Sequence, residues 1–191
     1  RLLQISAAAG SFYQHLLLSG EAGVAGRGSL RKRGYEGETV RAFGLGFAPE
    51  ARGALEKHLA EKKFSNSDVR QSGLVRPDKQ ERGYYELFRN RLLFPIHDLQ
   101  GRIVAFGGRV LDDSLPKYIN SPETMIYHKG QTLYGLYQAR DAMRHNGEAL
   151  VVEGYFDVLA LHRAGFSGAV ATCGPALTGD HARLPKRSAD K

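Results

Sequence analysis

The sequence predicts a mixed α/β protein, in which a helical and β-hairpin region is followed by the first βαβ unit of a parallel sheet. Three observations support this fold class. Apolar residues three and four positions apart recur over residues 1–64, two apolar runs flank Asp98–Gly101, and the apolar run Ala149–Val152 precedes a helical pattern and a second apolar run. With 191 residues, 42% of them hydrophobic, the chain is long enough to bury a core.

The first 64 residues have the spacing of amphipathic helices. In the opening segment the apolar residues recur at helical spacing, as Leu2, Ile5, Ala9, Phe12 and Leu16. This segment also imitates a signal peptide, but polar residues interrupt it, and no apolar run in the chain is long enough to span a membrane. We therefore expect a soluble helix and no membrane partner. Because the chain begins with Arg rather than Met, we expect it to be a piece of a longer protein.

The middle of the chain predicts a β-hairpin and then a stiff loop. The segment "RLLFPIHDLQGRIVAFGGRVL" places two apolar runs around a four-residue loop, Asp98–Gly101. Gly107 and Gly108 indicate either the close approach of a backbone or phosphate, or a β-bulge. The polar stretch that follows is stiffened by Pro116 and Pro122, whose rings fix the backbone.

A helix and a βαβ unit are predicted in the last third of the chain. The helix runs from about Thr132 to His145 and ends at Asn146–Gly147, a favourable C-cap. The βαβ unit has a strand at residues 149–152, a helix at about 155–164 that stops at a glycine, and a second strand at 169–172. Its four consecutive apolar residues predict that the first strand is buried on both faces, and we expect a parallel sheet.

Glu153 directly follows the first strand of this unit. A carboxylate at the end of a buried strand must be paired, solvated or bound to a cation, and Gly154 leaves room for a ligand. Ligands of parallel sheets bind at the carboxyl ends of the strands, so Glu153 is a candidate functional residue. The alternative is an acid that satisfies the amides of the next helix. Asp157 lies in the first turn of that helix, and we interpret it as an acid that stabilises the helix dipole in preference to a metal ligand.

The charge distribution is uneven. The net charge is +7, and Lys plus Arg outnumber Asp plus Glu by 22 to 15 up to residue 147 but are equal beyond it. This pattern suits a polyanion lying across the basic part, and equally suits an ordinary solvated surface.

The single cysteine, Cys173, excludes an internal disulfide and a cysteine-based zinc site within this chain, in agreement with a reducing cytoplasm. His97 and His128 have no ligand spacing with a partner.

Four segments resemble, in order and spacing, the signature blocks of the RNA-polymerase core of the bacterial DnaG-type DNA primases. They are "LLFPIHDLQGRIVAFGGRVL", "PKYINSPET", "YHKGQTLYGL" and "LVVEGYFDV". The resemblance implies two domains, an N-terminal basic subdomain at residues 1–146 and a partial TOPRIM subdomain at 147–191. It also implies a bacterial cytoplasmic protein of the replisome.

The same resemblance implies roles for individual residues. Glu153 matches the TOPRIM glutamate that acts in catalysis and binds Mg²⁺ or Mn²⁺. Cations that match the groove for template DNA and nucleotides are Arg89, Arg91, Arg109, Lys117 and Lys129, each of which has a plain surface cation as its alternative. Two further residues of the groove, Tyr118 and Asn120, would stack on or hydrogen-bond to a nucleotide; a packed Tyr beside a turn-forming Asn is the alternative.

The chain also departs from the family pattern. It reads Glu86-Leu87 where the family usually has Asp-Arg, so one groove cation is missing. No Asp-x-Asp motif follows Glu153, so we expect weak Mg²⁺ binding and little catalysis by this chain alone. Near its end, Pro175 replaces a small or hydroxyl residue, and Pro185 is expected to break the last helix.

These observations predict a fragment of a DNA primase. Its parent enzyme would join ribonucleoside triphosphates into short RNA primers on a single-stranded DNA template by metal-dependent nucleotidyl transfer. A replicative helicase would bind through a C-terminal region that is not present in this chain, and the zinc ribbon of a full primase is also outside it. Two alternatives remain: a non-catalytic fragment that binds single-stranded DNA, and another TOPRIM enzyme, a topoisomerase or nuclease.

Overall fold

The computed structural model describes residues 1–78, 83–174 and 176–189, so the substitution at Pro175 lies outside the described residues. The chain forms two compact units. The first unit contains Arg1–Pro95 and Ile103–Ile126, and the second contains Ile96–Arg102 and Tyr127–Lys191. Each unit has its own sheet and its own buried apolar residues. No helix among the described residues is both long and apolar enough to cross a membrane.

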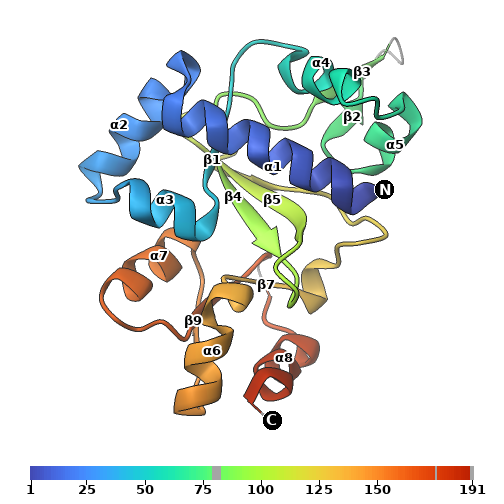
Figure 1. Cartoon of the computed structure of the whole chain (residues 1–191). Helices are drawn as coiled ribbons and strands as arrows, with labels where there is room; N and C mark the ends of the chain where they lie inside the picture. Colours follow the sequence, from blue (N-terminus) through green and yellow to red (C-terminus); the bar gives the residue numbers. More distant parts are fainter. Residues whose placement is uncertain (79–82, 175, 190–191) are drawn as a thin grey trace. The chain divides into compact units, whose positions relative to one another are not determined.

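Helices dominate the start of the first unit, as the apolar spacing predicted. They are α1 (Leu2–Ser19), the 3-10 helix η1 (Glu21–Gly23), α2 (Val24–Lys32), α3 (Gly37–Phe43), α4 (Ala54–Glu61) and α5 (Asn66–Gln71). Helix α1 lies across the sheet (Figure 1), and its buried face follows a four-residue spacing through Ile5, Ala9, Tyr13 and Leu17. The helix is therefore a core element.

A short strand, β1 (Gly46–Ala48), interrupts this helical region and was not predicted. It pairs antiparallel with β4 (Arg91–His97) through Gly46 and Leu93. A Cβ atom at Gly46 would lie 2.6 Å from the Cβ of Tyr13, so only glycine allows the strand to pass this close to α1. Three residues carry too little alternation to be recognised as a strand from sequence.

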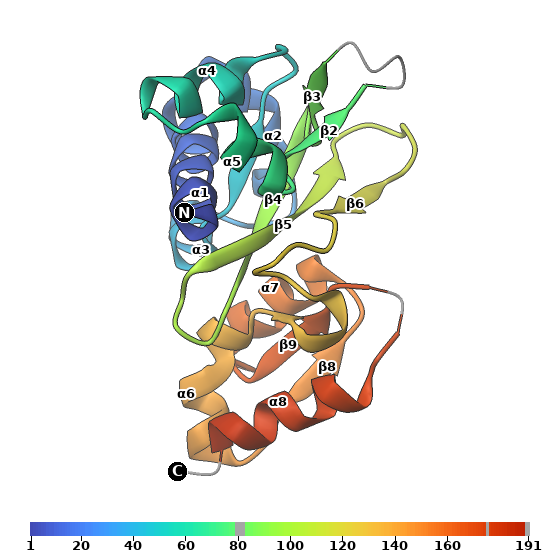
Figure 2. The same ribbon diagram turned by 90° about the vertical axis from the view of Figure 1, so that its right-hand side faces the viewer.

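The predicted hairpin is confirmed, with a tighter loop than expected. Strands β4 and β5 (Ile103–Val110) are neighbours in the sheet β1-β4-β5-β6, where β6 is Tyr118–Asn120 (Figure 2). The backbone N–H of Asp98 donates to the carbonyl of Arg102 at 3.0 Å, so the loop has three residues. Gly101 has φ +80°, which is the conformation expected at the end of such a loop.

Gly108 is required by packing. Residues Gly107 to Arg109 pair with Asn120 to Tyr118 in unbroken register, so strand β5 has no bulge towards β6 at this point. A Cβ atom at Gly108 would lie 2.7 Å from the ring of Phe88. Phe88 in turn meets Phe106 edge to face, with 6.2 Å between the ring centroids. Contact with a buried aromatic ring therefore explains Gly108 by packing, which neither sequence interpretation of the glycine pair had considered.

A second hairpin carries a buried carboxylate to helix α4. Strands β2 (Val75–Pro77) and β3 (Tyr84–Glu86) pair antiparallel. Glu86 is 4% exposed, and its Oε1 accepts hydrogen bonds from the backbone N–H groups of Leu55 and Glu56 at 2.8 and 3.2 Å. These amides belong to the first turn of α4, so Glu86 caps that helix. Burial raises the pKa of the Glu86 carboxyl above its ordinary value.

The second unit contains the predicted βαβ arrangement. Its elements are the 3-10 helix η2 (Lys129–Gln131), β7 (Leu133–Tyr134), α6 (Leu136–Asn146), β8 (Leu150–Val152), α7 (Tyr155–Arg163), β9 (Ala169–Thr172) and α8 (Gly179–Ala189). Strands β8 and β9 are parallel, as predicted, but β7 adds to β9 antiparallel, so the sheet is mixed. Helix α6 begins later than predicted because Gly135 has φ +79°, which separates it from β7.

Two expectations about the second unit were wrong. Strand β8 is not buried on both faces: Leu150 and Val151 are 41% and 44% exposed, because β8 lies at the edge of the order β7-β9-β8 while β9 is central. Helix α8 does not break at Pro185 but continues to Ala189. A proline inside a helix removes one backbone hydrogen bond, and in α8 this loss does not end the helix.

Cys173 follows β9 and is buried. Burial raises the pKa of its thiol to about 12, so the thiol stays protonated at neutral pH. It behaves as a small apolar side chain of the core.

The substitution Gly108→Ala should lower the free energy of unfolding by about 1–3 kcal/mol, because the added methyl group must displace the ring of Phe88. Urea unfolding measures this effect. A matched control is Gly28→Ala, since a Cβ atom at Gly28 on α2 meets nothing within 4 Å and alanine favours a helix. Equal stability of the two variants would contradict the packing argument.

The free energy of unfolding of the Glu86→Gln variant, compared with that of the wild type, should increase as the pH rises. In the wild type the pKa of Glu86 in the folded state lies above its ordinary value of 4.5. Between the ordinary pKa and the raised pKa of the folded state, the folded protein binds more protons than the unfolded chain. The stability of the wild type therefore falls as the pH rises through that interval. Glutamine keeps an acceptor oxygen for α4 without the charge. Thermal unfolding of both proteins from about pH 4 to about pH 7 measures the difference; a constant difference would refute the argument.

Candidate nucleic-acid interface

Strands β5 and β6 bring several of the predicted groove residues together in the first unit. Arg109 and Tyr118 face each other across the two strands, and the guanidinium carbon of Arg109 lies 5.7 Å from the centre of the Tyr118 ring. Asn120 pairs with Gly107 in the same ladder. Lys117 immediately precedes β6 and is exposed, and Tyr118 is 39% exposed. This edge therefore offers cations, an aromatic ring and an amide within one short segment.

Arg91 lies beneath this segment. Only 8% of the residue is exposed, and its guanidinium donates three hydrogen bonds to backbone carbonyls. Nη1 donates to Gly108 at 3.3 Å and to Lys117 at 3.4 Å, and Nη2 donates to Pro116 at 3.0 Å. Burial lowers the pKa of Arg91 from its ordinary value.

Backbone and hydroxyl contacts also hold β6 in place. The N–H of Val110 donates to the carbonyl of Lys117 at 3.1 Å, and the N–H of Ser121 donates to the carbonyl of Phe106 at 2.9 Å. The buried Ser121 hydroxyl accepts a hydrogen bond from the N–H of Phe106 at 3.0 Å. The exposed side chains of this edge thus stand on a well-connected backbone.

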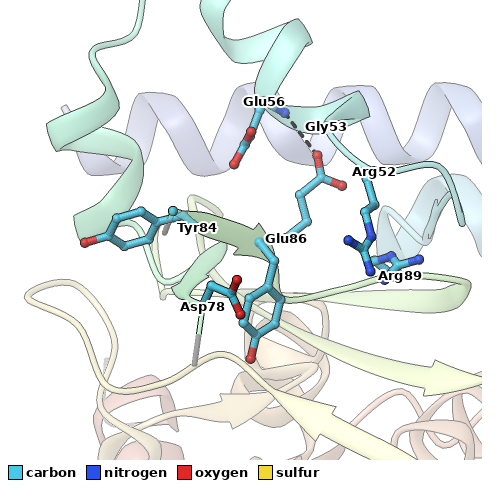
Figure 3. A pocket seen from close by; sticks show the side chains of 9 residues that line it. Arg52, Gly53, Glu56, Asp78, Tyr84, Glu86 and Arg89 are labelled. Carbon is cyan, nitrogen blue, oxygen red and sulfur yellow. Dashed lines mark hydrogen bonds between the residues drawn. The ribbon is translucent and has the colours of Figure 1, made fainter. Parts of the chain in front are cut away.

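Arg89 lies at a second location in the first unit. Its Nε and Nη2 both donate to the carbonyl of Glu50, at 3.3 and 3.2 Å. It lines an open cleft of about 460 Å³, and its head group lies beside that of Arg52 (Figure 3). The other residues around this cleft are Gly53, Glu56, Asp78, Gly83, Tyr84, Tyr85 and Glu86.

Sequence reasoning missed Arg52, Tyr84 and Tyr85 of this cleft, and also its acids Glu56 and Asp78. Tyr84 and Tyr85 are both exposed. The pair of adjacent tyrosines is the sequence feature that could have drawn attention to this site. Arg52 belongs to no recognisable motif. At position 87, where the family usually has a cation, Leu87 packs against the apolar core of the unit.

Glu153 lies in the second unit, directly after β8, and is exposed. Asp157 does not join it as a second free carboxylate, because its Oδ2 accepts a hydrogen bond from the N–H of Gly154 at 3.1 Å. Asp157 therefore caps α7, in agreement with its interpretation as a helix-stabilising acid. In the described part of the chain, no three His, Cys, Asp or Glu side chains are grouped so that they could hold a metal ion.

Lys129 also lies in the second unit, in η2, and is half-buried. Its carbonyl is 2.7 Å from Nε2 of His181, a buried histidine of α8. Nearby, the Thr178 hydroxyl donates to the carbonyl of Gly130 at 2.6 Å. His97 is half-buried, and burial lowers the pKa of its imidazole.

Comparison with known proteins agrees with these features. Residues 12–140 match the family described as the DNA primase catalytic core, N-terminal domain, and residues 147–191 match the Toprim domain. The DNA primase of Halalkalibacterium halodurans is 44% identical over 189 residues, which are 99% of this chain and 32% of that protein. The DNA primase of Pseudomonas aeruginosa is 47% identical over 180 residues, 94% of this chain and 27% of that protein.

Solved structures are similar along almost the whole chain. The RNA polymerase domain of Mycobacterium tuberculosis primase DnaG has 38% identity and a TM-score of 0.91, with coverage of 99% of this chain and 61% of that one. A DnaG primase catalytic domain bound to single-stranded DNA has 40% identity and a TM-score of 0.89, with coverage of 98% of this chain and 60% of that one.

These matches confirm the predicted fold class and the predicted resemblance. The chain spans about a third or less of the curated relatives named above, with 32% and 27% of their lengths. The matched blocks extend from residue 12 to residue 191 with only a short interval between them. The chain belongs to the family of DnaG-type DNA primases, of whose catalytic core it carries the N-terminal domain and part of the Toprim domain.

Proposed function

We propose that this chain is the part of a primase that holds single-stranded DNA template and nucleotides while short RNA primers are made. The observation that carries the proposal is the β5–β6 edge, where Arg109, Lys117, Tyr118 and Asn120 stand together. Exposed cations bind a phosphate backbone without reading its sequence, and an exposed ring accepts a stacked base. A relative described as bound to single-stranded DNA has the same fold.

We assign the two roles to different parts of the chain. Residues 1–146 would bind template, primer and nucleoside triphosphates, with Arg89, Arg109, Lys117 and Lys129 as phosphate contacts. The separate cleft beside Arg89 would contribute Arg52 and two exposed tyrosines as further contacts. Residues 147–191 would form the start of the Toprim subdomain. Arg91 would support the surface from within, as argued in the next subsection.

Glu153 is the proposed catalytic carboxylate. Toprim domains typically bind Mg²⁺, and Mg²⁺ is commonly held by one or two carboxylates together with waters and substrate phosphates. An exposed carboxylate at the carboxyl end of β8 fits one such ligand. Asp157 accepts the cap hydrogen bond from Gly154 through Oδ2, so we assign the metal-binding role to Glu153 and a helix-capping role to Asp157. We therefore propose that this chain by itself binds DNA and performs little primer synthesis.

The Lys117→Ala substitution tests the nucleic-acid surface. The wild-type chain should bind an unstructured single-stranded oligonucleotide with an affinity that falls steeply as salt is raised, because bound cations release counterions from the DNA. Loss of one phosphate contact should weaken binding and reduce the slope of log K against log salt by about 0.7. Fluorescence anisotropy over a salt series measures both quantities.

Lys32→Ala is the matched control for this experiment. Lys32 is an exposed cation in the last turn of α2, outside the β5–β6 edge and the Arg89 cleft. Its removal should change the slope much less. A salt-independent affinity of the wild-type chain, or equal effects of the two substitutions, would overturn the proposed surface.

The Glu153→Gln substitution tests the carboxylate. In the wild type, Mg²⁺ should strengthen the binding of ATP, because a metal held by Glu153 contacts the triphosphate. The variant should lose most of this Mg²⁺ effect and keep its metal-free affinity for single-stranded DNA. Isothermal titration calorimetry with ATP, with and without Mg²⁺, gives the comparison. An unchanged Mg²⁺ effect in the variant would exclude Glu153 as the ligand.

A further inference from the structure

We propose that Arg91 is a positioning residue of the primase surface: it holds the backbone at Pro116 and Lys117 in place and does not itself contact nucleic acid. We call residues 111–117, which connect β5 to β6, the Lys117 loop. The inference rests on the proposed function for its consequence in DNA binding. Its structural part, the hold on the loop, can be tested without any nucleic acid.

The first step is the geometry of the hydrogen bonds. Arg91 begins β4, and its acceptors lie 17 to 26 residues further along the chain, at Gly108, Pro116 and Lys117. Pro116 and Lys117 are the last two residues of the Lys117 loop, and both of their carbonyls are bound by the same guanidinium. The side chain therefore fastens the end of the loop to the centre of the sheet.

The second step is the accessibility of the donors. A phosphate contact needs N–H groups that face solvent, whereas Arg91 is 8% exposed and its guanidinium is engaged by three carbonyls. A buried cation bound by carbonyl dipoles is stable only while those carbonyls remain in place. The side chain and the loop thus depend on each other. The negative charge of Asp112, an exposed residue of the same loop, partly offsets the effect of burial on the pKa of Arg91 and so favours its charged form.

The third step is the choice of arginine. The planar guanidinium has five N–H donors in a fixed fork and can reach carbonyls on two segments at once, while the ammonium group of lysine concentrates its donors at one point. Lysine at position 91 would keep the charge but could not hold Gly108, Pro116 and Lys117 together. The arrangement is therefore specific to arginine.

The fourth step links the loop to the candidate interface. Lys117 is followed at once by Tyr118, which pairs with Arg109, and then by Asn120, which pairs with Gly107. The carbonyl of Lys117 also accepts a hydrogen bond from the N–H of Val110. A shift of the backbone at Pro116 and Lys117 would move the side chain of Lys117 and the start of β6 together.

Limited trypsin digestion tests the hold on the loop. In the Arg91→Met chain, cleavage after Lys117 should be faster than in the wild type by about tenfold or more, because the loop opens locally. Cleavage after Arg41 in α3, in the same unit, serves as the control for general unfolding. An equal acceleration at both positions would mean that Arg91 contributes only to overall stability, and no acceleration at Lys117 would mean that it does not hold the loop. Either result overturns the proposal.

A double-substitution cycle tests the link to DNA. If Arg91 acts through the loop, Lys117→Ala should weaken single-stranded DNA binding clearly in the wild type and much less in the Arg91→Met chain. Two independent phosphate contacts would give additive losses, each with its own decrease of about 0.7 in the salt slope. Additive losses would overturn the proposal even if the nucleic-acid surface itself is correct.

Arg91→Lys provides the second variant, and it remains informative if Arg91→Met does not fold. It should resemble Arg91→Met in digestion after Lys117, because it keeps the charge without the fork. Full recovery of wild-type digestion and DNA affinity by lysine would show that charge alone matters and would refute the positioning role. If the wild-type chain does not bind DNA, the proposed function fails, while the digestion experiment still decides whether Arg91 holds the loop.

Discussion

The candidate interface depends on the burial of strand β4. This strand lies between β1 and β5, and its residues from Arg91 to Ile96 are buried. Phe88, just before the strand, packs against the bare backbone of Gly108. The first unit therefore has a rigid centre, and the short edge strand β6 takes its position from it. Exposed side chains on such an edge are held at defined positions without any ligand present.

Two ionisable side chains of the first unit are buried, and main-chain groups satisfy both. Glu86 accepts hydrogen bonds from amides in the first turn of α4, and Arg91 donates to carbonyls of β5 and the Lys117 loop. Among the described residues of this unit, neither forms an ion pair with another side chain. Because backbone dipoles carry no net charge, the two groups stiffen local structure without neutralising the exposed cations nearby. Those cations remain available to a polyanion.

The second unit has a different character. Its central strand β9 is buried, while β8 is an edge strand that ends in Glu153. The acid next to it, Asp157, is engaged in capping α7. One exposed carboxylate at a strand end is suited to share a hard cation with substrate phosphates, and it is a weak metal site by itself. This agrees with the proposal that the chain by itself performs little primer synthesis.

Sequence by itself determined the helices of residues 1–64, the β4–β5 hairpin and the βαβ unit whose first strand precedes Glu153, and the resemblance of four segments to known signature blocks indicated the family. The secondary-structure elements follow from residues close together in the chain, whose spacing reports local conformation directly. Only the tertiary structure decided that Arg91 is buried, that Gly108 accommodates Phe88, that β8 is an edge strand, and that Arg52 lies beside Arg89. These features depend on partners many residues away, such as the carbonyls 17 to 26 positions beyond Arg91. An arginine on the surface and one beneath a loop look the same in a sequence, because the difference lies in which distant groups fold over the side chain.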